Sequence, residues 1–73
     1  MMKKLAMGID IGGTNTAFGL VDEDGNVVAE GKISTEQFKY YDDYKPYIET
    51  LATAMKELIA SQPECDLIGI ALH

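Results

Sequence analysis

A carboxylate followed at once by two glycines and two hydrogen-bonding side chains stands out near the start of the chain. These residues are Asp10, Gly12, Gly13, Thr14 and Asn15. Glycine has no Cβ and can take positive φ, so a ligand can approach the backbone N–H groups, and such a loop can cradle a phosphate. Asp10 beside a phosphate would repel it by about 3 kcal/mol, for unit charges about 5 Å apart at an effective dielectric constant of about 20. A divalent cation between the carboxylate and the phosphate turns this repulsion into attraction. Mg²⁺ suits this place, because it binds through one or two carboxylates plus substrate phosphates. We therefore interpret Asp10 as a metal-directing group.

The same residues also fit a simpler interpretation, in which the loop is only a tight hairpin turn and Asp10 a strand-end residue. Two adjacent glycines alone favour that turn. The surrounding pattern favours the phosphate loop, because alternating apolar residues in 5–11 and 16–21 predict a strand on each side of it. Residues 22–26, Asp-Glu-Asp-Gly-Asn, then predict a hairpin that leads to a third strand over 27–34.

The Asp-x-Gly-Gly-Thr pattern between the first two strands resembles the first phosphate motif of the superfamily of actin, sugar kinases and heat-shock-chaperone ATPases. Residues 8–15, Gly-Ile-Asp-Ile-Gly-Gly-Thr-Asn, are similar to the opening of a ROK-type sugar kinase of the bacterial glucokinase group. Gly-Leu-Val-Asp at 19–22 and Gly-Asn-Val-Val at 25–28 extend the similarity. The element order matches over the whole chain, whereas the specific motif is confined to about the first thirty residues.

This resemblance implies transfer of a phosphoryl group from ATP to a hexose hydroxyl, with glucose the expected sugar and Mg²⁺ assisting. By the motif match, Asp10 would direct the metal, and Gly12 and Gly13 would offer their backbone to the nucleotide phosphates. Thr14 and Asn15 would add polar contacts. The family's catalytic base, its zinc ligands and its adenine pocket lie on later segments, so we assign no catalytic residue and no zinc ligand here. We expect residues 1–73 to be part of one lobe, a fragment that is inactive alone.

The rest of the chain predicts one compact α/β unit. Residues 46–62 carry an apolar helical stripe that includes Ile48, Leu51 and Met55, with Pro46 in the first turn and Asp42 or Asp43 helping the start. Residues 66–72 predict a last strand, which a crossover helix would place parallel to an earlier one. The expected fold is therefore an actin-like (ribonuclease H-like) ATPase half-lobe, with three antiparallel strands plus one parallel strand after the crossover.

A single helix covers only one face of such a sheet. The other face should be lined by small residues, because a glycine shares its side of the strand with an alanine on three of the four predicted strands. A chain this short typically buries only about 60% of its unfolded surface. We therefore expect self-association through an uncovered sheet face or edge. The aromatic residues of 38–47 should pack the connecting segment onto the helix, although they could also stack a nucleobase or form an association surface.

Composition narrows the possible partners. The net charge is −6 and the chain contains no arginine, which argues against nucleic-acid binding. The first apolar run is interrupted by Asp10, which leaves it too short for a membrane span or a secretion signal. One cysteine, Cys65, forms no internal disulfide, which fits a reducing cytoplasm. His73 is the only histidine and, as the terminal residue, has no assigned role.

Two alternatives from other functional classes remain at this point. The first is the sugar-sensing domain of a ROK-type transcriptional repressor, which keeps the fold without catalysis. Such repressors carry a helix-turn-helix ahead of the first strand, and the few residues before Leu5 argue against that reading. The second is a non-catalytic, self-associating module in which the loop binds nothing.

Overall fold

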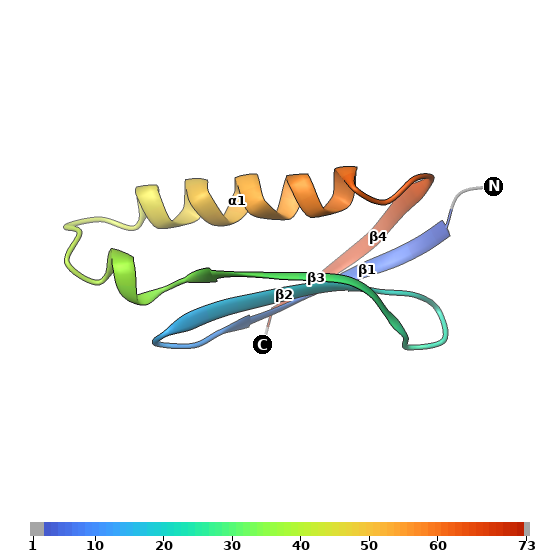
Figure 1. Ribbon diagram of the computed structural model, residues 1–73, viewed down its shortest axis with the longest axis horizontal. Helices are drawn as coiled ribbons and strands as arrows, with labels where there is room; N and C mark the ends of the chain where they lie inside the picture. Colours follow the sequence, from blue (N-terminus) through green and yellow to red (C-terminus); the bar gives the residue numbers. More distant parts are fainter. Residues whose placement is uncertain (1–2, 73) are drawn as a thin grey trace.

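The computed structural model describes residues 3–72, so His73 lies outside the described residues. A four-stranded sheet carries one long helix on one of its faces (Figure 1). The elements, in chain order, are β1 (Lys3–Ile11), β2 (Asn15–Val21), β3 (Val27–Ser34), the short 3-10 helix η1 (Glu36–Phe38), α1 (Lys45–Ala60) and β4 (Cys65–Leu72).

The sheet has the strand order β3-β2-β1-β4. Neighbouring strands in the β1-β2-β3 meander are antiparallel, whereas β4 runs parallel to β1 after α1 has crossed the sheet. This confirms the predicted mixed α/β sheet, which is compatible with an actin-like half-lobe. The helix begins one residue earlier than predicted, at Lys45, whose backbone N–H donates to Oδ1 of Asp43 at 2.8 Å.

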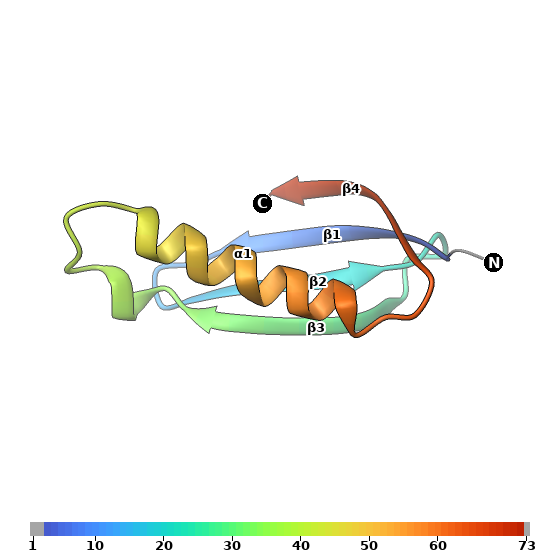
Figure 2. The same cartoon turned by 90° about the horizontal axis from the view of Figure 1, so that it is seen from above.

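The hydrophobic core lies between α1 and the face of the sheet that the helix covers. Alternate residues of β1 and β2 point into it, because successive strand residues face opposite sides. Its buried apolar residues are Leu5, Met7, Ile9, Phe18, Leu20, Tyr47 and Leu51. Figure 2 shows α1 lying over β1, β2 and β3, while β4 lies beside this layer.

The prediction of the buried helical stripe was wrong for one residue. Ile48 is 54% exposed, and its neighbour Tyr47, at 9%, takes the buried position. Tyr47 packs edge-on against Phe38 with ring centroids 5.7 Å apart, which joins the connecting segment to the helix as predicted. Tyr40, Tyr41 and Tyr44 are exposed, so only part of the aromatic segment has this packing role.

Among the described residues, no helix covers the second face of the sheet, and small residues line much of it, as expected. The strand register aligns Ala71 with Gly8 and Gly8 with Gly19 across three strands of this face. Gly31 is the exception, because it lies on the core side, where an added Cβ would come within 2.9 Å of the Phe18 ring. Within residues 3–72, no helix combines the length and apolar character needed to cross a membrane.

The edge of the sheet at β4 is apolar and exposed. Ile70 and Leu72 align with the core residues Met7 and Ile9, yet they remain 57% and 69% exposed because α1 does not reach β4. Residues 67–72 contain no charged side chain. The opposite edge, β3, carries Glu30 and Lys32, and charged residues protect an edge strand against pairing. We expect a second copy of β4 to fit this edge, because antiparallel pairing about Ile70 would place apolar residues opposite each other.

We therefore expect Ile70→Lys to shift the chain toward monomer in sedimentation velocity across micromolar concentrations, since a charge at the pairing edge opposes association. Val27→Lys is a matched control, because Val27 is 58% exposed on β3 at the far edge. A wild-type chain that stays monomeric throughout would contradict the expectation. An equal shift in both variants would place the contact elsewhere than at β4.

The turn between β2 and β3 depends on one carboxylate. Oδ1 of Asp22 accepts the backbone N–H groups of Asp24 and Asn26, each at 2.9 Å. The Asn26 N–H is the main cause that lowers the pKa of Asp22 below its ordinary value of 3.8. Because the folded turn favours the ionised form, this carboxylate stabilises the hairpin above its ordinary pKa and loses that effect as the pH falls through the lowered pKa.

The backbone amide resonance of Asn26 should therefore titrate with a midpoint below 3.8 in an NMR pH titration. Asp22→Ala should abolish that titration, because the accepting carboxylate is gone. Asp24→Ala is the control and should preserve it, since Asp24 contributes only its backbone N–H to this turn. A midpoint at or above 3.8 in the wild-type chain would refute the proposed cause.

Candidate functional site

The predicted phosphate loop is the connection between β1 and β2. The Gly12 N–H donates to the Asn15 carbonyl at 3.0 Å and closes the turn. A Cβ at Gly12 would lie 3.0 Å from that same carbonyl oxygen, so a side chain here would crowd the backbone. A Cβ at Gly13 would meet nothing within 4 Å, so the loop is open on that side. Neither Gly12 nor Gly13 has a positive φ. Among the glycines that the structure describes, only Gly25 has one.

Two backbone amides of the loop remain unbonded. Gly13 and Thr14 lie between the two strands, outside the strand pairing. Within residues 3–72, their N–H groups donate to no protein acceptor. The hairpin interpretation thus accounts for the amide of Gly12, whereas the next two amides are available to an anion. All five predicted site residues, Asp10, Gly12, Gly13, Thr14 and Asn15, are exposed.

The carbonyl of Thr14 fastens the loop to the end of β3. It accepts the backbone N–H of Thr35 at 2.9 Å and that of Glu36 at 3.2 Å. These two donors come from the segment where β3 ends and η1 begins. The loop is therefore attached to the sheet at a point beyond its own two strands.

A buried cluster of three hydroxyl groups lies beneath this attachment. Thr16 is fully buried, and within the described chain it is the one buried polar residue. Its Oγ1 lies 2.5 Å from the Tyr47 hydroxyl and 2.6 Å from Oγ1 of Thr35. The cluster was missed by the sequence analysis, although a threonine aligned with Phe18 and Leu20 on the core side was a usable signal. A buried hydroxyl needs a partner, and the partner has to come from another element.

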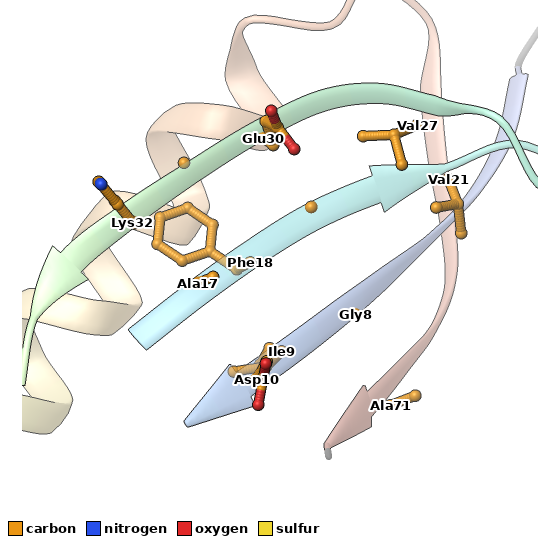
Figure 3. A pocket seen from close by; sticks show the side chains of 12 residues that line it. Gly8, Ile9, Asp10, Ala17, Phe18, Val21, Val27, Glu30, Lys32 and Ala71 are labelled. Carbon is orange, nitrogen blue, oxygen red and sulfur yellow. The ribbon is translucent and has the colours of Figure 1, made fainter. Parts of the chain in front are cut away.

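Asp10 lies on the uncovered face, near the end of β1. The register aligns Asp10 with Ala17 and Ala17 with Lys32, so the three side chains share one row across the sheet. The carboxylate makes no hydrogen bond or ion pair with any other described residue. Figure 3 shows Asp10 and Lys32 on separate strands with Ala17 between them. Lys32 was not singled out by the sequence analysis, because its place beside Asp10 depends on strand pairing.

The small residues of this face leave room above the sheet. A groove of about 710 Å³ includes Asp10 and Lys32 in its lining (Figure 3). Gly8, Ala17 and Gly19 also line it and have no bulky side chain to fill it. An extended ligand could therefore lie on this face with its anionic end toward the loop.

At the loop, one carboxylate, that of Asp10, is placed to meet a metal, and the other carboxylate that lines the groove, Glu30, lies two strands away on β3. Among residues 3–72, no three side chains from His, Cys, Asp or Glu gather as a ligand set. This does not suit zinc in a structural site, which takes four protein ligands. It suits Mg²⁺, which is often bound through one or two carboxylates together with phosphate and water oxygens.

Comparison with known proteins gives one match. The sequence matches the model of the ROK family over residues 6–73, which includes the loop, the three hydroxyl groups, most of β1 and the other three strands. No curated protein and no solved structure is similar enough to match. The ROK family includes sugar kinases and related regulators. With the match extending over nearly the whole length, this chain belongs to the ROK family.

Proposed function

We propose that this chain is the phosphate-binding portion of an ATP-dependent sugar kinase, which transfers the γ-phosphoryl group of ATP to a hexose hydroxyl. One observation carries the proposal: Asp10, whose carboxylate has no partner among the described residues, stands two residues before a turn in which two amides bond to none of those residues either. A simple turn does not require either feature. Family membership supports a kinase, and the glucokinase group is the member type that we propose.

The amides of Gly13 and Thr14 would donate to phosphate oxygens, because nothing in the described protein competes for them. The Thr14 hydroxyl and the Asn15 side-chain amide are exposed beside them and would add polar contacts. Asp10 would hold the cation, directly or through its water shell. Bound Mg²⁺ would neutralise the charge that develops on the phosphate oxygens during transfer.

The charges of the site make binding depend on the metal. Asp10 opposes a bare polyphosphate by a Coulomb repulsion of about 3 kcal/mol at a distance of about 5 Å and an effective dielectric constant of about 20. Solvent screening reduces this value, because the carboxylate is exposed. A bound Mg²⁺ between the two anionic groups turns this repulsion into attraction. Asp10 therefore serves as a selector for the metal-bound nucleotide.

Residues 3–72 would bind and orient phosphate without completing the reaction. Phosphoryl transfer depends on positioning and on stabilisation of charge from both substrates. No residue of this chain is proposed as the base that accepts the hexose proton. We therefore expect the purified 73-residue chain to show no Mg²⁺-dependent phosphorylation of glucose in a coupled assay. Measurable turnover would mean that the chain holds more of the active site than we propose.

Asp10→Asn should change metal-free and metal-bound nucleotide affinity in opposite directions. Removing the negative charge should raise the affinity for metal-free ATP and lower that for Mg²⁺-ATP, each by several-fold. The measurement is titration of the ¹⁵N-labelled chain, followed at the amide resonances of Gly13 and Thr14. Asp24→Asn is the matched control, because Asp24 is an exposed carboxylate in the turn at the other end of β2 and should change neither affinity.

Two results would refute the proposed function. The first is the absence of any shift at Gly13 and Thr14 in the wild-type chain at millimolar Mg²⁺-ATP. The second is a shift that Asp10→Asn leaves unchanged with and without metal, because the loop would then bind anions without the carboxylate that defines the motif.

A further inference from the structure

We infer that Tyr47 is a positioning residue, whose hydroxyl acts through Thr16 and Thr35 to hold the loop over 12–15 in its place on the sheet. The part of this inference that concerns ligand affinity rests on the proposed function. The part that concerns the loop itself rests only on contacts within the chain.

The three hydroxyl groups come from three separate elements. Thr16 is the second residue of β2 and lies one residue after the loop, Thr35 directly follows β3, and Tyr47 lies in the first turn of α1. Thr16 is central, with contacts of 2.5 Å to Tyr47 and 2.6 Å to Thr35. The start of α1 is thereby connected to the base of the loop.

Thr35 connects the hydroxyl cluster to the loop, because its side chain bonds to the cluster and its backbone bonds to the loop. Its Oγ1 contacts Thr16, and its backbone N–H donates to the Thr14 carbonyl at 2.9 Å. A fixed Thr14 carbonyl fixes the last peptide plane of the loop. The unbonded amides of Gly13 and Thr14 lie in the two peptide planes before it, so the fixed carbonyl limits the directions that these amides can take.

The hydroxyl of Tyr47 can be separated from the rest of its side chain. The ring packs against Phe38 and forms part of the apolar core, and a phenylalanine ring would occupy the same space. The hydroxyl is the group that hydrogen-bonds to Thr16. Loss of that hydroxyl should therefore loosen the loop attachment while the core remains packed.

The test compares Tyr47→Phe with Tyr44→Phe, which makes the same chemical change at a side chain that is 81% exposed. Amide hydrogen exchange at Thr35 and Glu36 reports on the attachment, and exchange at Met7 and Leu20 reports on the sheet. Tyr47→Phe should accelerate exchange at Thr35 and Glu36 at least tenfold relative to Tyr44→Phe. Exchange at Met7 and Leu20 should change by less than threefold.

A second pair of variants tests the other end of the cluster. Thr35→Val removes the hydroxyl but keeps the branched shape, so it should produce the same local acceleration at Glu36. Thr35→Ser keeps a hydroxyl and should retain protection close to that of the wild type. Both Tyr47→Phe and Thr35→Val should weaken binding of Mg²⁺-ATP at Gly13 and Thr14 by about threefold to tenfold.

The outcomes distinguish the two proposals. The positioning role is overturned if the amides of Thr35 and Glu36 exchange at the same rate in Tyr47→Phe and Tyr44→Phe. It is also overturned if the exchange rates of all amides rise equally. If the wild-type chain shows no response to Mg²⁺-ATP while the local acceleration occurs, the proposed function fails and the positioning of the loop stands. If nucleotide binds but Tyr47→Phe leaves its affinity unchanged, the inferred influence on the ligand is overturned.

Discussion

The buried hydroxyl of Thr16 is the constraint around which this end of the molecule is organised. A hydroxyl without solvent access must be hydrogen-bonded inside the protein, and here its partners come from the end of β3 and the start of α1. Satisfying that one group brings three elements together directly below the loop between β1 and β2. The loop is thus held by the packing of the half-lobe, although its own turn contains a single closing hydrogen bond.

The hydrophobic core lies on one face of the sheet. The candidate site lies on the other face and at the end of the sheet that carries the loop. Bulky residues of β1 and β2 meet α1, whereas the opposite face holds glycine and alanine together with Asp10, Glu30, Lys32 and two valines. Small side chains keep that face open to a large ligand or to another packed element. A carboxylate exposed on such a face costs little, because it remains hydrated until a cation binds. The arrangement keeps folding and ligand binding on separate surfaces.

Much of the fold followed from local patterns. Alternation of apolar residues located the strands, the Asp-Gly turn located the second hairpin, and Pro46 located the start of the helix to within one residue. These features depend on neighbours in sequence, which is why a single sequence carries them. Ile48 shows where this reasoning fails. Tyr47 and Ile48 both fit the helical stripe, and the partners that favour Tyr47, namely Phe38 and Thr16, belong to other elements.

The sequence by itself determined the family, the element order and the loop that holds Asp10, Gly12, Gly13, Thr14 and Asn15, because these are encoded in short contiguous runs of residues. Only the tertiary structure decided that the Gly12 amide closes the turn, while the next two amides find no acceptor within residues 3–72. It also placed Lys32 in one row with Asp10 and connected Tyr47 to the loop through Thr16 and Thr35. The physical reason is that strand register and helix placement bring together groups up to 31 residues apart, and no periodicity along the chain encodes such a meeting.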